Sequence, residues 1–218
     1  MTKLTITKIR FFIISLILLG TTGTQAQVMG FREPLVHMSV KAGGGLSVLA
    51  SAPVKSAVGP LAGLTISRNL GRAGVRLELL GSMFSYTTKF PASYYSLYSP
   101  GMDTVSKGEF QAIYGSAPLL VEYQFREKIQ LLFGPQVSYL VTLTDKNNAF
   151  TKIYGEDKFL KKIDVSVVAG AEYTITKKLK AGARLVIGVT DVNNSIYYLV
   201  PRSWTTFGAQ IALSYKIL

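Results

Sequence analysis

Cysteine is absent from the 218-residue chain, and histidine and tryptophan each occur once. Without cysteine the protein can form no disulfide framework, and a lipoprotein anchored through a cysteine at the cleavage site is excluded. A single histidine, His37, and no thiolate leave too few of the ligands that zinc prefers. We therefore expect no metal and no cofactor, and a stability that comes from the fold itself.

A long apolar run is also missing after residue 26, although 48% of all residues are hydrophobic. A membrane-spanning helix needs roughly 20 consecutive apolar residues, so the sequence predicts no helical span in this part of the chain. High hydrophobic content without such a run indicates apolar residues dispersed by alternation, as on the outer surface of a β-barrel.

The one continuous apolar run lies near the N-terminus, at Phe11 to Leu19, and three basic residues precede it. Small and polar residues then lead to Ala26, which completes the pattern of a secretory signal peptide. We expect cleavage after Ala26, so that residues 1–26 are the signal and residues 27–218 form the mature domain.

Basic residues outnumber acidic residues by 24 to 12, which gives a formal net charge of +12. Such an excess can serve nucleic-acid binding. An exported chain rarely meets nucleic acid, so we expect no nucleic-acid partner. Contact with anionic lipid headgroups or lipopolysaccharide is the use of the charge that export favours.

Eight segments of the mature chain alternate apolar residues with small or polar ones, which is the pattern of β-strands. They exceed the usual five or six residues of soluble strands and reach the roughly nine to eleven that a tilted transmembrane strand needs. The segments are Val36 to Ala50, Val58 to Leu70, Val75 to Lys89, Glu109 to Phe125, Ile129 to Leu143, Ile163 to Ile175, Leu179 to Thr190 and Arg202 to Leu218. Their apolar parity is expected to face lipid. Pro135 lacks an amide donor and predicts a local irregularity in the fifth segment.

The connections between these segments alternate in length. The long ones are 51–57, 90–108, 144–162 and 193–201, and the short ones are 70–74, 126–128 and 176–178. Alternate connections of an up-and-down barrel fall on the same rim, and outer-membrane barrels have short periplasmic turns. The chain is therefore predicted to form an all-β, eight-stranded antiparallel up-and-down transmembrane β-barrel, located in the outer membrane, with both ends periplasmic. Closure removes the strand edges that would otherwise be exposed.

Charged residues on the inward parity are the candidates for a polar network inside the barrel. The interior of an eight-stranded barrel is only wide enough for side chains to fill, and unpaired buried charge is costly. We therefore expect these side chains to pair across the lumen in a structural role, with Arg76, Glu78, Glu122 and Arg184 at the centre. The complete set is Lys41, Arg76, Glu78, Glu122, Asp164, Glu172 and Arg184.

Catalysis finds little support in the residues. His37 lies on the inward parity near the periplasmic start of the first segment, where a structural role is favoured over a catalytic one. The chain has no Gly-x-Ser-x-Gly or His-Glu-x-x-His motif. We assign no catalytic residue and expect a monomeric, non-enzymatic barrel. A narrow solute channel and, less favoured, a lipid-modifying enzyme are the alternatives.

The predicted external loops carry the remaining candidates for binding. Tyrosines there either form a protein-binding surface or belong to the aromatic girdle at the membrane boundary. Lysines there either bind anionic lipopolysaccharide or are simply solvated. The residues concerned are Tyr94, Tyr95, Tyr98, Lys152 and Lys158.

The stretch from Ser116 to Val141, SAPLLVEYQFREKIQLLFGPQVSYLV, is followed by DVSVVAGAEYTITKKLKAGARLVIGVTDV and the terminal TFGAQIALSYKIL. Together these resemble the PorT-like outer-membrane β-barrel family of Bacteroidetes, over roughly Val36 to Leu218. The strongest elements are Ala117 to Leu120, Gly134-Pro135 and Arg184 to Asp191. The resemblance implies a barrel in the cell outer membrane with a structural or accessory role, contact with other envelope proteins, and a link to protein secretion or assembly. It implies no catalytic residues.

Overall fold

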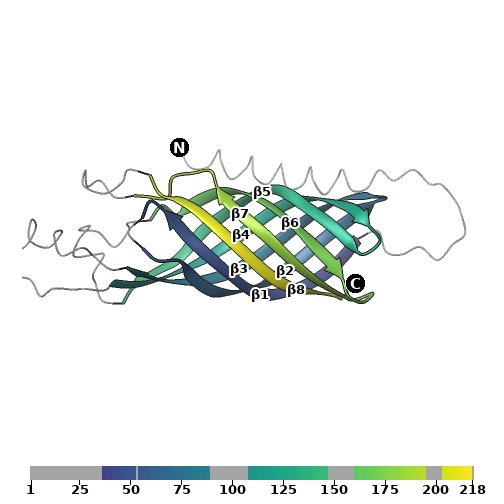
Figure 1. Cartoon of the computed structure of the whole chain (residues 1–218), viewed down its shortest axis with the longest axis horizontal. Helices are drawn as coiled ribbons and strands as arrows, with labels where there is room; N and C mark the ends of the chain where they lie inside the picture. Colours follow the sequence, from purple (N-terminus) through teal and green to yellow (C-terminus); the bar gives the residue numbers. More distant parts are fainter. Residues whose placement is uncertain (1–35, 53, 89–107, 147–159, 195–202, 218) are drawn as a thin grey trace, which may run out of the picture. The chain divides into compact units, whose positions relative to one another are not determined.

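The computed structural model describes residues 36–52, 54–88, 108–146, 160–194 and 203–217. The predicted signal peptide lies outside these residues, as do the five candidate residues of the external loops. The described part forms eight antiparallel strands that wind around one axis (Figure 1). Their bounds are β1 Val36–Ala50, β2 Ala57–Leu70, β3 Ala73–Thr88, β4 Gly108–Arg126, β5 Ile129–Asp145, β6 Ile163–Thr174, β7 Leu179–Gly188 and β8 Thr205–Lys216.

Each strand pairs with the next in sequence, and β8 returns to pair with β1. The closing ladder runs from Ser39↔Lys216 to Ala50↔Thr205 and is as continuous as the others. The sheet therefore has no free edge, and the predicted eight-stranded antiparallel barrel is confirmed. Within the described ranges, none of the chain forms a helix that is long and apolar enough to cross a membrane.

The short turns all lie at one end of the barrel, together with the start of β1 and the end of β8 (Figure 1). The β2–β3 turn is tighter than the predicted connection 70–74, because Leu70 already pairs with Ala73. Only Gly71 and Arg72 remain outside the ladder. Gly71 has a φ of 90°, the positive value that a type II′ hairpin turn requires at its first central position.

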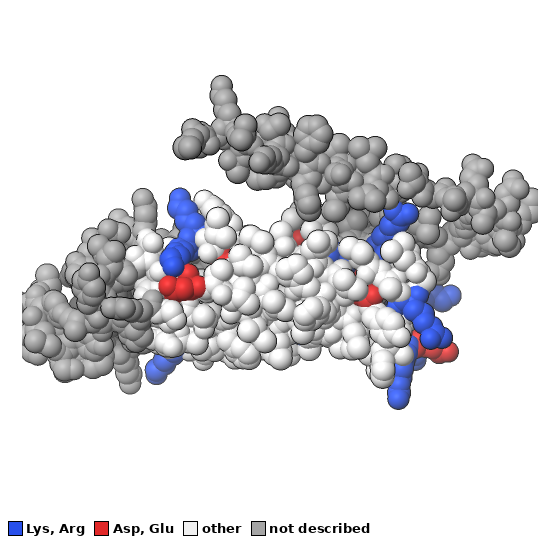
Figure 2. Space-filling model, turned by 90° about the horizontal axis from the view of Figure 1, so that it is seen from above, with Lys and Arg blue, Asp and Glu red and all other residues white. Residues whose placement is uncertain are grey.

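The two faces of the strands differ as the alternation predicts. Outward side chains such as Val137, Leu185 and Ile211 are 49%, 46% and 71% exposed, whereas the inward Leu120 and Val168 are fully buried. On the face seen in Figure 2, uncharged side chains cover the middle of the barrel, and the charged ones lie toward its two ends. An apolar band bounded by charge is the outer surface that a lipid bilayer accommodates.

The irregularity predicted at Pro135 takes the form of a gap in the pairing with β4: the ladder has no pairs between Pro118↔Gln136 and Val121↔Phe133, although its register does not shift. Pro135 pairs with Val167 of β6 in the same register as its neighbours, and β4 and β5 keep one register from Pro118↔Gln136 to Val121↔Phe133. The two register shifts of that ladder lie elsewhere, between Ile113 and Tyr114 and between Gln124 and Arg126. A proline lacks the backbone N–H donor, so the pairing with β4 is interrupted here while the register on both sides is kept.

Candidate functional site

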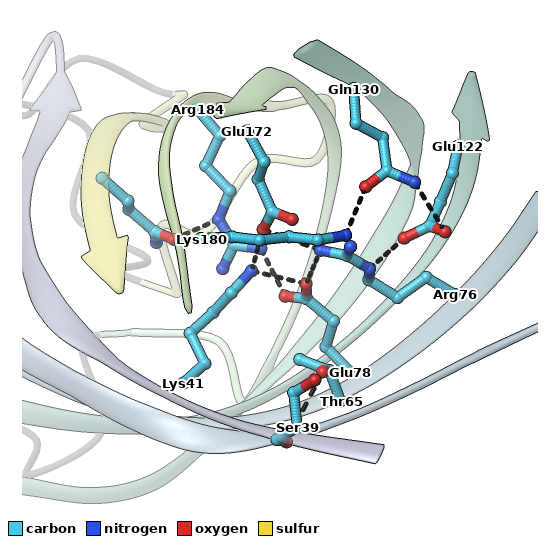
Figure 3. A network of polar contacts seen from close by, with 11 residues as sticks. Ser39, Lys41, Thr65, Arg76, Glu78, Glu122, Gln130, Glu172, Lys180 and Arg184 are labelled. Carbon is cyan, nitrogen blue, oxygen red and sulfur yellow. Dashed lines mark hydrogen bonds and ion pairs between the residues drawn. The ribbon is translucent and has the colours of Figure 1, made fainter. Parts of the chain in front are cut away.

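The half of the lumen nearer the short turns contains a network of ion pairs centred on Glu78 of β3. Its carboxylate accepts hydrogen bonds from Lys41 Nζ of β1 at 2.6 Å and from Arg184 Nη1 of β7 at 2.5 Å. Arg76 Nη1 approaches the same carboxylate at 3.5 Å. Glu78 is fully buried, and Figure 3 shows the three cations converging on it from three strands. Three cations around one buried carboxylate compensate for its loss of hydration.

Arg76 joins this centre to two further carboxylates. Its Nη1 donates to Glu172 Oε1 of β6 at 2.7 Å, and its Nε contacts Glu122 Oε1 of β4. Lys41 Nζ lies 3.2 Å from the same Glu172 oxygen. The second oxygen of Glu122 accepts a hydrogen bond from Gln130 Nε2 at 3.0 Å. The network therefore links β1, β3, β4, β5, β6 and β7 across the lumen.

Two further polar side chains, Lys180 and Gln210, join this network. Lys180 Nζ donates to Gln130 Oε1 at 2.8 Å, and Arg184 Nε donates to Gln210 Oε1 of β8 at 2.6 Å. Lys180 was not among the predicted lumen residues, although it shares the inward parity of Arg184 and could have been found from it. With Lys180, the network contains four cationic side chains and three carboxylates, and Lys180 joins it through Gln130.

Two glycines make room for the network. A Cβ atom on Gly182 would lie 2.7 Å from Glu172 Cγ. A Cβ atom on Gly170 would lie 2.5 Å from Arg184 Cβ. Both distances are shorter than real side-chain contacts allow, so glycine at these inward positions of β6 and β7 lets the carboxylate and the guanidinium occupy the lumen.

Six of the seven predicted lumen residues meet in this network, but Asp164 does not. Asp164 of β6 accepts a hydrogen bond from Thr190 Oγ1 at 2.9 Å. It lines a separate cavity of about 40 Å³, together with Ser47, Tyr86 and Gln136. This volume holds at most a few water molecules. Because eight tilted strands stagger the inward positions, residues of the same parity reach different levels of the lumen.

An apolar cluster fills the other half of the lumen, toward the long connections. The rings of Tyr86 and Phe110 stack with their centroids 4.8 Å apart, and Phe84 lies against Tyr86 at 6.5 Å. The hydroxyl of Tyr86 shares a hydrogen bond of 2.7 Å with Ser47 Oγ. Trp204 is fully buried in the same cluster. Sequence reasoning missed this cluster, although Phe84 and Tyr86 continue the inward parity of β3. The whole cluster is Leu49, Ala57, Phe84, Tyr86, Phe110, Ala112, Leu140, Leu160, Val192 and Trp204.

Next to this cluster, Asp191 connects three chain segments through hydrogen bonds and an ion pair. One carboxylate oxygen accepts the backbone N–H groups of Asn193 at 3.0 Å and Trp204 at 2.8 Å, and the other lies 3.2 Å from Lys161 Nζ. Desolvation opposes ionisation here, but the two N–H donors and the ammonium outweigh it and lower the pKa of Asp191 below its ordinary value of 3.8. Ionised Asp191 therefore holds the segment containing Trp204 against those before β6 and after β7.

These arrangements supply little for catalysis or metal binding. Each carboxylate of the network already contacts at least one cationic side chain, which leaves it a poor general base. In the described ranges, no three side chains of histidine, aspartate or glutamate are grouped so that they could hold a metal ion. His37 of β1 is partly buried near the short-turn end.

The family model for the outer membrane protein beta-barrel domain matches residues 25–194, so the chain belongs to this family of outer-membrane barrels. The fold is similar to the crystal structure of Neisserial surface protein A, with 12% identity over 84% of this chain and 97% of that chain, and a TM-score of 0.51. This likeness supports the barrel fold. The protein is accordingly an outer-membrane β-barrel protein of the small, eight-stranded kind.

Two further solved structures are similar at lower TM-scores. Ail of Yersinia pestis is 12% identical over 84% of this chain and 97% of its own, with a TM-score of 0.42. Outer Membrane Protein W of E. coli is 13% identical over 85% of this chain and 100% of its own, with a TM-score of 0.42. No curated protein matches the sequence.

Proposed function

We propose that this protein is a monomeric, non-enzymatic barrel with a structural or accessory role in the outer membrane, and that its function lies on its surfaces. The observation that carries this proposal is the filled lumen. The ion-pair network occupies one half, and the apolar cluster of Phe84, Tyr86, Phe110 and Trp204 occupies the other. A barrel filled with its own side chains offers its loops, rims and outer wall to other molecules.

The free-energy cost of burying charge supports a structural role for the charged residues of the lumen. Burying charge is expensive unless it is paired, and six of the predicted charged residues meet in one compensated network. A channel lined by polar groups would leave these side chains hydrated, whereas Glu78 is fully buried and Arg76 is 4% exposed. Such a network braces the barrel wall and obstructs the passage of solutes.

The external loops are the proposed binding surface for other envelope components. Tyr94, Tyr95 and Tyr98 would contact another envelope protein, because tyrosine is favoured at protein interfaces. Lys152 and Lys158 would contact the phosphates of lipopolysaccharide. The resemblance to PorT-like barrels supports a place for this protein in a secretion or assembly system.

The test is gentle detergent extraction of the native protein, followed by identification of the proteins recovered with it. We expect one envelope protein to be recovered reproducibly, and its amount to fall at least several-fold in a Tyr94→Ser/Tyr95→Ser/Tyr98→Ser variant. A control for tyrosines outside the loops replaces Tyr123, Tyr173 and Tyr215, which lie on the outer wall, with phenylalanine and should leave recovery unchanged. Reproducible recovery of the barrel alone, or equal recovery with all three proteins, would contradict the accessory role.

A further inference from the structure

Exposed cations lie at both ends of the described barrel, and those at the short-turn end follow the three short turns. At the rim of the short turns, Arg72 lies in the β2–β3 turn, Arg126 ends β4 and Lys128 lies in the β4–β5 turn, and Lys177 and Lys178 form part of the β6–β7 turn. All five side chains are exposed. Glu127 is the one acidic residue in these three turns. We call these five cations the basic ring.

The basic ring differs from the opposite rim in one respect: two of the four exposed lysines described there, Lys146 and Lys161, make ion pairs, whereas Lys55 and Lys162 do not. At the opposite rim, Lys161 Nζ lies 3.2 Å from Asp191, and Lys146 Nζ lies 3.8 Å from Glu109. Within the described residues, no cation of the basic ring makes an ion pair. Its positive charge is therefore available to a partner.

Backbone hydrogen bonds fix the turns that carry the basic ring. The carbonyl oxygen of Arg72 accepts the N–H of Gln124 at 2.8 Å, and that of Lys178 accepts the N–H of Lys216 at 2.7 Å. The carbonyl oxygen of Lys128 accepts the N–H of Thr174 at 2.8 Å. Each turn is thus tied to the neighbouring strand, and the cations follow the rim around the barrel.

Three tyrosines show how deep the basic ring sits relative to a membrane. Tyr123, Tyr173 and Tyr215 point outward and are 47%, 48% and 49% exposed. Each is paired with a residue beside a short turn, as in Ala73↔Tyr123 and Leu179↔Tyr215. Tyrosine concentrates at the boundary between the hydrocarbon and the headgroups. Cations immediately beyond the tyrosines therefore lie at the level of the lipid phosphates.

We propose that the basic ring binds the headgroups of anionic glycerophospholipids in the periplasmic leaflet and enriches these lipids around the barrel. The periplasmic assignment follows from the outer-membrane location, because short turns of such barrels face the periplasm. A lipid leaflet touches the whole circumference, as the basic ring does. An acidic protein docking from one side would need cations on that side only. This binding is separate from the proposed accessory function, which uses the external loops.

The experiment measures lipid selectivity of the folded barrel in phosphatidylcholine vesicles containing spin-labelled phosphatidylglycerol or spin-labelled phosphatidylcholine. We expect the wild type to prefer phosphatidylglycerol at low salt, and the preference to fall at least twofold in an Arg72→Gln/Lys128→Gln/Lys177→Gln variant. A single cation close to an anionic surface contributes about fivefold, or ~1 kcal/mol, and averaging over the lipid shell reduces the observed change.

A control of equal charge replaces Lys55, Lys146 and Lys162 with glutamine at the opposite rim, where all three are exposed. It should retain the wild-type preference. A preference that is unchanged in the ring variant, or that falls equally in both variants, would overturn the proposal. A wild-type barrel that shows no preference for phosphatidylglycerol would also overturn the proposal. A basic ring that binds an acidic protein instead of lipid would give this result.

A second measurement uses only the wild-type barrel, so its result does not depend on how the variants fold. Raising the salt concentration to 0.5 M should abolish the preference, because screening shortens the reach of charge from about 10 Å at 0.1 M to a few ångströms. A preference that persists at high salt would contradict binding through the basic ring. The purified barrel carries no accessory partner in this assay, so its result leaves the proposed accessory function untouched.

Discussion

Glu78 of β3 and Arg184 of β7 meet inside the barrel with 2.5 Å between Oε2 and Nη1, although 106 residues separate them in sequence. The two strands are not neighbours in the sheet, so this contact crosses the lumen. Lys41 and Arg76 contact the other oxygen of the same carboxylate. Glu78 is therefore the residue whose loss should weaken the barrel most.

Replacing Glu78 with glutamine should lower the free energy of unfolding by about 3–5 kcal/mol, the usual cost of removing one partner from a buried ion pair. The variant leaves Arg184, Lys41 and Arg76 buried with less negative charge around them. Urea unfolding of the barrel in lipid vesicles, followed by tryptophan fluorescence, measures the change.

Two further variants decide whether the effect comes from the network. Glu127→Gln, on the exposed β4–β5 turn, should change the unfolding free energy by less than about 0.5 kcal/mol. Glu78→Gln/Lys41→Gln should cost less than the sum of its two single substitutions, because removing the cation relieves the imbalance of charge. Additive costs would show that the 2.6 Å contact between the two residues contributes no coupling.

An arginine on the outer wall should be costly in the middle of the apolar band and tolerated near the rim. Leu185→Arg should lower stability by about 2–4 kcal/mol and impair membrane assembly, whereas Ile217→Arg should cost at most about 1 kcal/mol. The parent side chains are 46% and 56% exposed, so exposure alone predicts similar costs. Vesicle insertion and urea unfolding test the difference, and equal costs at both positions would contradict the placement of the band.

Polar substitution at Val167, which points outward on β6, should impair assembly in the same way as at Leu185. Normal insertion of both Val167→Asn and Leu185→Asn would show that the outward face does not meet lipid.

Acid should release the segment that contains Trp204, the single tryptophan of the chain. The pKa of Asp191 is lowered in the folded barrel, so its stabilising contribution is complete above the ordinary value of 3.8 and is lost as the pH falls through the folded value. Because the backbone N–H of Trp204 donates to Asp191, tryptophan fluorescence should shift to longer wavelength only below about pH 3.8.

The Asp191→Asn variant should show part of this fluorescence shift at pH 7, because its uncharged amide accepts hydrogen bonds more weakly and cannot pair with Lys161. Glu127→Gln, at the opposite rim, serves as the control and should behave as the wild type does. An identical acid response in Asp191→Asn and the wild type would assign the transition to another group.

The barrel fold was predictable from the sequence because the two features that indicate it, strand alternation and connection length, can be read from short stretches of the chain. Strand alternation separates the outward Leu185 from the inward Arg184, and the alternating lengths of the connections give the topology. The same alternation placed Glu78 and Glu122 inside the lumen. These predictions needed only the period of a strand and the length of each loop.

What sequence reasoning missed depends on the stagger between strands, which alternation does not report. Asp164 and Glu172 share a strand face, yet one lies beside Thr190 and the other beside Arg76. Lys180 reaches Gln130 only because of the register that closure imposes. The aromatic contact between Tyr86 and Phe110 likewise follows from the pairing of β3 with β4. Registers of this kind are set by the whole barrel.

The most direct test of the account is the ionic conductance of the purified barrel in a planar lipid bilayer at neutral pH. With Glu78, Arg76 and Arg184 paired across one half of the lumen and Phe110 and Trp204 buried in the other, we predict no conductance steps above those of the bare bilayer. Reproducible steps from the wild type that change size in Glu78→Gln would place the ion path through this network and contradict the closed, structural lumen.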